Sequence, residues 1–260
     1  MPDWIEVIIL GIIEGVTEFL PVSSTGHLLI AEHWLGKQSD LFNTVIQCGA
    51  VLAVVVIFTG RLKQLLFHLH DPAPRDYLLK LGVAFFLTGV GGVVLKKLDF
   101  ELPKTAAPVA WATLIGGILF LVVERGLRGK SVGDQVTWTV AIAVGLGQLV
   151  AAVFPGASRS GMTILVALML GLSRPAATEF SFLLGIPTLL SAGALQIFSA
   201  LKKPDAPPIE WGLLALGSVV GLVTAFAAVK WLLRFVQSHT FEGFGWYRIV
   251  LGVVILLLIR

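Results

Sequence analysis

Apolar runs separated by short polar turns follow one another along the whole chain. Six runs approach or exceed the roughly 20 apolar residues that a helix needs to cross a bilayer. They cover residues 41–59, 77–94, 107–123, 176–200, 210–233 and 243–259. The basic, histidine-containing stretch 60–76 between the first two runs predicts an amphipathic surface segment. The pattern therefore predicts an all-α polytopic membrane protein with six transmembrane helices.

Two further apolar stretches are interrupted halfway by polar residues and a proline, Pro21 or Pro155. Because proline lacks a backbone N–H and tends to end a helix, each stretch is expected to form two half-helices. The four half-helices cover residues 4–20, 24–35, 134–153 and 158–171. Irregular backbone is tolerated at membrane depth only where protein or water surrounds it. We therefore expect two re-entrant helix hairpins that enter and leave on the same side.

The two interrupted stretches resemble each other. Residues 11–29, GIIEGVTEFLPVSSTGHLL, return 134 residues later as GLGQLVAAVFPGASRSGMTIL, residues 145–165. At this offset Ser24 matches Ser158, while Arg159 and Ser160 replace Thr25 and Gly26. Three crossings lie between the hairpins, so the second copy should enter from the opposite face. This predicts an inverted-topology repeat, approximately 4–100 and 134–260, whose copies share one site within a single integral membrane domain, 1–260.

Composition agrees with a membrane protein. Apolar residues make up 56% of the 260 residues, charged residues only 13%, and the mean hydropathy is +0.90. The net charge of +3 is not clustered with aromatic residues, so we expect no nucleic-acid partner. The single cysteine, Cys48, excludes an intramolecular disulfide.

Basic residues predict the orientation. Eleven, Arg248 among them, fall on one side of the six-crossing arrangement and seven on the other. Basic residues favour the cytoplasmic side, so both termini and the shared pocket should face the periplasm.

Charged residues inside apolar segments mark the candidate site. Glu14 and Glu18 are four apart and so share one helical face. Each intramembrane charge costs roughly 2.5–3.5 kcal/mol on insertion scales, which structure alone seldom justifies. In the second copy, Arg159 offers a fork of donors that matches phosphate oxygens. Further donors for an anion come from Gly156, Ser158, Ser160 and Thr163.

The motifs EGVTEFLPVSSTGH and PGASRSGMT resemble those of the undecaprenyl-diphosphate phosphatase family, also called the bacitracin-resistance family. The similarity covers nearly the whole chain. It implies a bacterial inner-membrane phosphatase that converts undecaprenyl diphosphate to undecaprenyl phosphate for peptidoglycan synthesis and gives tolerance to bacitracin. It also implies essential residues, namely Glu14, Glu18, Ser24, His27 and Arg159.

Several roles stay open at this level. Ser24 is the candidate nucleophile, with His27 as its base or as the acid for the leaving group, but attack by an activated water is the alternative. Glu14 and Glu18 could hold a divalent cation, Mg²⁺ or Ca²⁺, or one of them could orient His27. Ser23 and Thr25 either bind substrate or cap the helix that carries His27.

A transporter or lipid flippase for a polyprenyl phosphate or diphosphate is the second hypothesis, because inverted repeats with broken helices are typical of secondary transporters. Both hypotheses expect the same partners, a polyprenyl diphosphate lipid and the bilayer. The sequence does not decide between a monomer and a homodimer.

Overall fold

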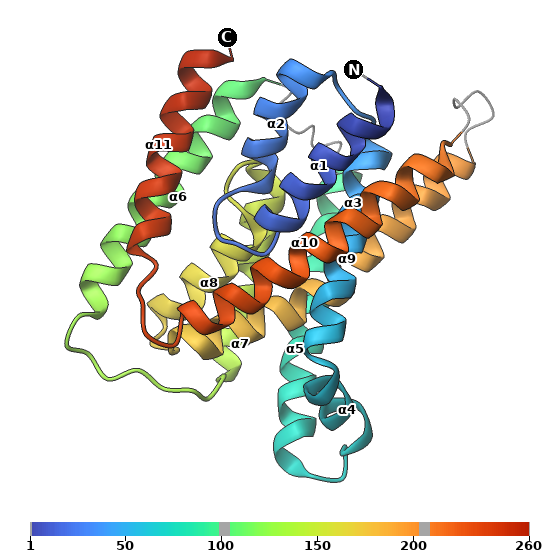
Figure 1. The fold of residues 1–260 in the computed structure, drawn as a ribbon. Coiled ribbons are helices and arrows are strands. Elements are labelled where there is room, and N and C mark those ends of the chain that lie inside the picture. Colours follow the sequence, from blue (N-terminus) through green and yellow to red (C-terminus); the bar gives the residue numbers. More distant parts are fainter. Residues whose placement is uncertain (1, 99–104, 203–208, 260) are drawn as a thin grey trace.

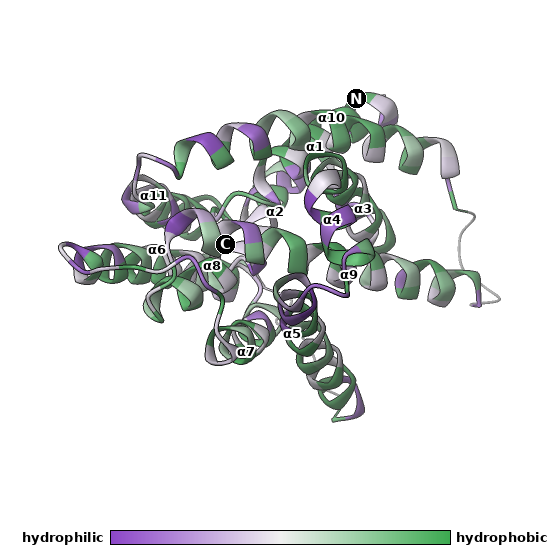
Figure 2. Ribbon diagram, turned by 90° about the horizontal axis from the view of Figure 1, so that it is seen from below, coloured by the Kyte–Doolittle hydropathy of each residue, from purple (hydrophilic) through white to green (hydrophobic). Residues whose placement is uncertain are grey.

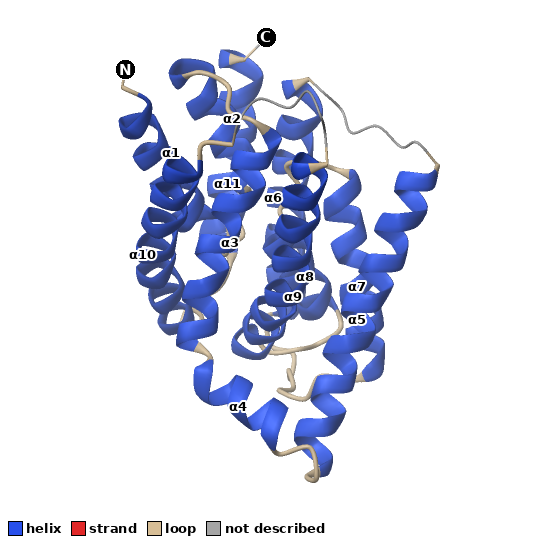
Figure 3. Ribbon diagram, turned by 90° about the vertical axis from the view of Figure 1, so that its right-hand side faces the viewer, coloured by secondary structure: helices blue, strands red, loops and turns tan. Residues whose placement is uncertain are grey.

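The computed structural model describes residues 2–98, 105–202 and 209–259, and within them it contains eleven α-helices and no β-strand (Figures 1 and 3). The helices are α1 (Asp3–Thr17), α2 (Ser24–Leu35), α3 (Asp40–Ile57), α4 (Thr59–Phe67), α5 (Pro72–Lys97), α6 (Ala106–Leu127), α7 (Trp138–Val153), α8 (Arg159–Met169), α9 (Arg174–Leu201), α10 (Trp211–Phe235) and α11 (Glu242–Leu258). Each apolar run predicted from the sequence corresponds to one helix. The all-α, membrane-type class is confirmed.

Five helices, α3, α5, α6, α9 and α10, are long and apolar enough to cross a membrane. The sixth predicted crossing, 243–259, corresponds to α11, which has 17 residues and packs along α6. Two pairs of shorter helices fall where the half-helices were predicted. We call α1, residues 18–23 and α2 the first hairpin, and α7, residues 154–158 and α8 the second hairpin.

Two helices begin more than two residues from the predicted start. Helix α5 begins at Pro72 rather than near residue 77, because prolines fit the first turn, where backbone N–H groups have no helical partner. Helix α7 begins at Trp138 rather than at 134. The residues before it pair instead with the chain after α8, where Gly133 N donates to Gly171 O at 2.9 Å.

The outward faces of the long helices are apolar (Figure 2). Large side chains such as Phe86, Val122 and Leu195 are more than half exposed there. Exposed apolar side chains of this kind suit contact with lipid. The predicted surface segment contains α4, which lies at one end of the molecule (Figure 3) and exposes Phe67 while burying Leu65.

Close packing places the first hairpin in the interior. Helix α1 packs along α10, and α2 contacts α6 and α11. A Cβ on Gly15 would lie 2.0 Å from Thr224 Oγ1 of α10, so only glycine permits this approach. The second hairpin packs between α5, α6 and α9. The two hairpin turns consequently meet inside the bundle.

Helix α1 begins and α11 ends at the same end of the molecule (Figure 1). Three of the basic residues counted for orientation, Lys104, Lys203 and Arg260, lie outside the described residues. Arg248 was wrongly counted as a residue of one face, because its side chain is fully buried. Ten residues of the larger set remain as indicators of orientation.

Candidate active site

Both hairpin turns are built around a serine with a left-handed backbone. Ser23 has φ 73° and Ser158 has φ 69°, and they are the two non-glycine residues with positive φ in the described part of the chain. Each serine caps the helix that follows. Ser23 Oγ accepts from Gly26 N at 3.2 Å, and Ser158 Oγ accepts from Gly161 N at 3.1 Å. Ser23 therefore caps the helix that carries His27.

These caps correct the alignment of the repeat. With Ser23 equivalent to Ser158, Ser24 corresponds to Arg159, so the match of Ser24 with Ser158 was wrong by one residue. The second turn has one more residue between its proline and its cap. Gly156 accommodates it with φ 94°, and a Cβ there would lie 2.3 Å from Val109 O.

Glu18 lies at the centre of the site. Its Oε1 accepts from Arg159 Nη2 at 2.9 Å, and its Oε2 accepts from Ser24 Oγ at 2.8 Å. The Glu18 side chain is 6% exposed and the Arg159 side chain 12%. One carboxylate thus joins the first residues of α2 and α8, which are 135 positions apart in the chain.

Arg159 is held in a polar and aromatic environment. Its Nη1 donates to Ser181 O at 3.2 Å, and its guanidinium carbon lies 5.0 Å from the ring centre of Phe19. Arg159 Nε is buried and has no hydrogen-bond partner in the described structure. One donor of this arginine is therefore free to bind a further group.

Glu14 is fully buried, and its carboxyl group interacts electrostatically with Glu18 and Arg159. Neither of its oxygens has a hydrogen-bond partner among the described residues. Buried polar atoms without partners are rare in proteins and commonly indicate a bound ligand, water or ion. Glu14 and Arg159 Nε provide three such atoms around Glu18. The site is therefore equipped to bind both a cation and an anion.

His27 lies one helical turn from Ser23 but is not hydrogen-bonded to Ser24 or to either glutamate. Its Nδ1 lies 2.8 Å from Ser23 O and its Nε2 lies 2.7 Å from Tyr247 Oη of α11. Because a carbonyl only accepts, Nδ1 carries the proton, and in the neutral ring Nε2 accepts from the tyrosine hydroxyl. Glu18 rather than His27 is thus the base nearest Ser24 in this structure.

The other predicted donors hold the two hairpins together. Ser160 is fully buried and donates to the carbonyl oxygens of Glu18 and Leu20, each at 3.1 Å. Thr163 is fully buried and lies 2.6 Å from Ser181 Oγ. Thr25, by contrast, is exposed at the start of α2.

Arg248 of α11 fastens both hairpin turns to α6. It is fully buried, and its guanidinium donates to Pro21 O of the first turn at 3.3 Å and to Gly156 O and Ala157 O of the second at 3.2 and 2.9 Å. Its remaining bonds go to carbonyl oxygens of α6. No acidic side chain in the described residues pairs with it. We call this set of bonds the Arg248 clasp.

Sequence reasoning missed Tyr247, Arg248, Thr113 and Ser181. Thr113 of α6 donates to Gly156 O at 3.1 Å and reaches Ser23 Oγ at 3.4 Å. A signal existed for Arg248, since an arginine within an apolar segment is a candidate for a special role. Hydroxyl groups carry no comparable signal, because serine and threonine are common in membrane helices and often bond to their own backbone.

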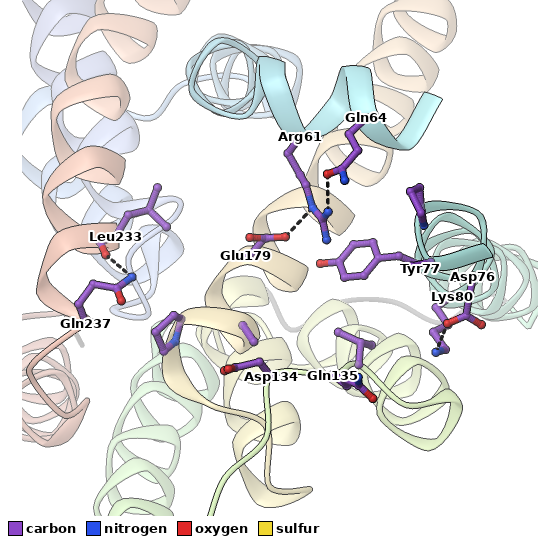
Figure 4. A pocket seen from close by; sticks show the side chains of 15 residues that line it. Arg61, Gln64, Asp76, Tyr77, Lys80, Asp134, Gln135, Glu179, Leu233 and Gln237 are labelled. Atoms are coloured by element: carbon purple, nitrogen blue, oxygen red, sulfur yellow. Dashed lines mark hydrogen bonds and ion pairs between the residues drawn. The ribbon is translucent and has the colours of Figure 1, made fainter. Parts of the chain in front are cut away.

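A second cavity, of about 670 Å³, lies where α4, α5, α9 and the chain before α7 meet (Figure 4). Four of its charged side chains form ion pairs, and Asp134 accepts a hydrogen bond from Ser173. Arg61 Nε donates to Glu179 Oε1 at 2.9 Å, and Lys80 pairs with Asp76. The Arg61–Glu179 pair joins α4 to α9, whereas the Lys80–Asp76 pair lies within α5. Glu179 therefore belongs to this cavity and not to the candidate active site.

An all-helical bundle with an arginine, two acids and a serine gathered in its interior is a polytopic membrane protein with a buried polar centre. The chain belongs to the family described as bacitracin resistance protein BacA, whose model matches residues 7–254.

Curated relatives are similar over nearly their whole length. An undecaprenyl-diphosphatase of Rhizobium etli is 52% identical over 255 residues, which are 98% of this chain and 96% of that protein. One from Xylella fastidiosa is 51% identical over 250 residues, 96% of each chain. One from Xanthomonas axonopodis pv. citri is 50% identical over 258 residues, 99% of this chain and 97% of that protein.

Proposed function

We propose that this chain is a membrane phosphatase that hydrolyses undecaprenyl diphosphate to undecaprenyl phosphate and inorganic phosphate. This reaction returns the carrier lipid to cell-wall synthesis and gives tolerance to bacitracin. The observation that carries the proposal is Glu18, which binds the hydroxyl of Ser24 on one oxygen and the guanidinium of Arg159 on the other. A nucleophile, its base and a phosphate-binding cation are thereby joined.

The reaction begins with Ser24 Oγ attacking the terminal phosphorus. Glu18 Oε2 accepts the hydroxyl proton, the bond from phosphorus to the bridging oxygen breaks, and undecaprenyl phosphate leaves. Water then hydrolyses the phosphoserine and releases inorganic phosphate. Arg159, through its unpaired Nε, binds a phosphate oxygen and stabilises the charge that develops there. In the alternative route, Glu18 activates a water and Ser24 only orients the phosphate.

The acids fit a divalent cation. Mg²⁺ is commonly held by one or two carboxylates together with substrate phosphates and water, and Glu14 offers two buried oxygens without partners. Among the described residues no group of three or more His, Cys, Asp or Glu could hold a metal alone. Glu14 and Glu18 would therefore hold Mg²⁺ or Ca²⁺ jointly with the substrate. When bound, the ion neutralises phosphate charge.

We infer that both hairpins are re-entrant and that the chain is an inverted-topology repeat. The lengths support this, because α1, α2, α7 and α8 have 15, 12, 16 and 11 residues, short of a full crossing. The matching left-handed caps, Ser23 and Ser158, support a duplication. Opposite entry of the hairpins follows if α3, α5 and α6 each cross once. The excess of basic residues near α4 and α5 favours a periplasmic first hairpin.

A lipid flippase would need a sealed bilayer and would leave the diphosphate intact. The deciding experiment is phosphate release from a long-chain polyprenyl diphosphate by the purified protein in detergent, with and without EDTA. We expect release that falls when EDTA is present. Absence of release in detergent, with transbilayer movement of intact lipid in vesicles, would refute the phosphatase.

A further inference from the structure

A largely apolar cavity of about 410 Å³, separate from the one beside α4, lies between the first hairpin, α10 and α11. Apolar residues of the hairpin form one wall and aromatic residues of the two helices form the other. These are Val16, Leu20, Val22, Trp231, Phe235 and Phe244. The volume lies in the range of small-molecule pockets, roughly 300–1,000 Å³.

The cavity is open on the outer side of the helix bundle. Val16, Trp231 and Tyr247 at its edge are 37%, 50% and 49% exposed, whereas Leu20 and Phe244 are nearly buried. Figure 1 shows the first hairpin lying between α10 and α11, which pack on other helices rather than along each other. A ligand can therefore enter from within the bilayer without crossing water.

The aromatic wall is preformed. The rings of Trp231 and Phe235 stack with centroids 5.1 Å apart, and Phe244 packs edge-on against both. Rings that already contact one another lose little further freedom when an apolar chain lies against them. The wall is thus suited to a flexible hydrocarbon.

The cavity borders the turn of the first hairpin, which also carries the candidate active site. His27 lines the cavity, and the carbonyl of Leu20, another lining residue, accepts a hydrogen bond from Ser160 of the second hairpin. Tyr247 stacks parallel to His27 at 5.6 Å and holds its Nε2. An apolar compartment therefore adjoins a polar one at the His27–Tyr247 pair.

We propose that this cavity binds the isoprenoid units next to the diphosphate, and that the His27–Tyr247 pair marks the boundary between lipid tail and head group. The proposal rests on the phosphatase function, because the occupant is the tail of its substrate. The cavity holds only the first few units, so the remainder of the chain lies in the bilayer between α10 and α11.

Photolabelling tests the location directly. The probe is a polyprenyl diphosphate with a diazirine in its second isoprene unit, bound to the full-length protein in lipid nanodiscs. We expect cross-links on peptides containing residues 16–22 and 231–247. Excess unlabelled polyprenyl diphosphate should remove them and excess phospholipid should not, which separates substrate from a bulk acyl chain. Competed labels elsewhere, or labels lost to phospholipid, would overturn the cavity assignment.

Gly243 allows a matched pair of variants. It lines the cavity, shares a helical face with Tyr247, and a Cβ there would meet no atom within 4 Å. Gly243→Phe should fill the cavity without disturbing the fold. Gly82→Phe on α5 is the control, because that glycine is also exposed and without neighbours.

We expect Gly243→Phe to lose the competed label and to raise KM for the long-chain substrate at least tenfold, with Gly82→Phe within twofold of wild type. Unchanged KM and labelling in Gly243→Phe would overturn the proposal. If the wild-type protein binds the probe at residues 16–22 but releases no phosphate, the phosphatase fails while the cavity assignment survives as a lipid-binding site.

Discussion

Ser24 and Arg159 are hydrogen-bonded to different oxygens of the same carboxylate, that of Glu18. Each residue is the first after the cap of its helix, and the two come from different hairpins. The candidate nucleophile and the candidate phosphate-binding residue are thus held by one acid. Substitutions at these three positions are therefore expected to affect turnover, substrate binding and stability differently.

Ser24→Ala should lower turnover by about 10³-fold or more while substrate binding is retained, because Arg159 keeps its position. Phosphate release and equilibrium binding of labelled substrate measure the two effects. Acid quenching of the wild-type reaction with a substrate labelled on the terminal phosphate should trap label on Ser24. Near-normal turnover of the alanine variant would assign the attack to water.

Arg159→Ala should abolish turnover, weaken substrate binding and destabilise the fold by roughly 3–5 kcal/mol, because it leaves Glu18 buried without its cation. The double variant Glu18→Gln with Arg159→Gln should recover much of the thermal stability and none of the activity. Recovery of both thermal stability and activity would show that the ion pair only links the two hairpins structurally.

Glu14→Gln should remove stimulation by Mg²⁺ or Ca²⁺ added after EDTA treatment, with little change in stability, since the amide has nearly the same shape. Glu242→Gln is the control, because that acid pairs with Arg128 at the start of α11, outside the site. Phosphate release against cation concentration measures the effect. Stimulation that persists in Glu14→Gln would place the metal elsewhere.

Arg248→Lys should lower the unfolding temperature in detergent and reduce turnover, because an ammonium group cannot reach the carbonyls of both turns and α6 together. Hydrogen bonds from charged groups contribute roughly 1.5–3 kcal/mol each, so losing two is a large effect. Arg125→Lys, at an exposed position of α6, should change neither quantity. A stable, fully active Arg248→Lys protein would contradict the clasp.

The fold was largely predictable because every helix that crosses a bilayer must be apolar and roughly 20 residues long. The gathering of Glu14, Glu18, Ser24 and Arg159 at the candidate site was predictable, but their individual contacts were not. Glu14, Glu18 and Arg159 can be recognised because they are charges inside apolar runs. Tyr247, the partner of His27, is 220 residues away, and nothing in the sequence around it distinguishes it from other aromatic residues near the membrane interface. The one-residue shift between Ser23 and Ser158 depends on backbone geometry, which a fixed offset does not reveal.

The Arg248 clasp also limits how the molecule can work. A protein that exposes its centre to each side of the membrane in turn must let one half tilt against the other. Here carbonyl oxygens of both hairpin turns accept hydrogen bonds from the same guanidinium, that of Arg248. Tilting would strip several carbonyls of their donor in a dry interior. With the two turns held together, the lipid would have to reach the centre by moving within the plane of the bilayer.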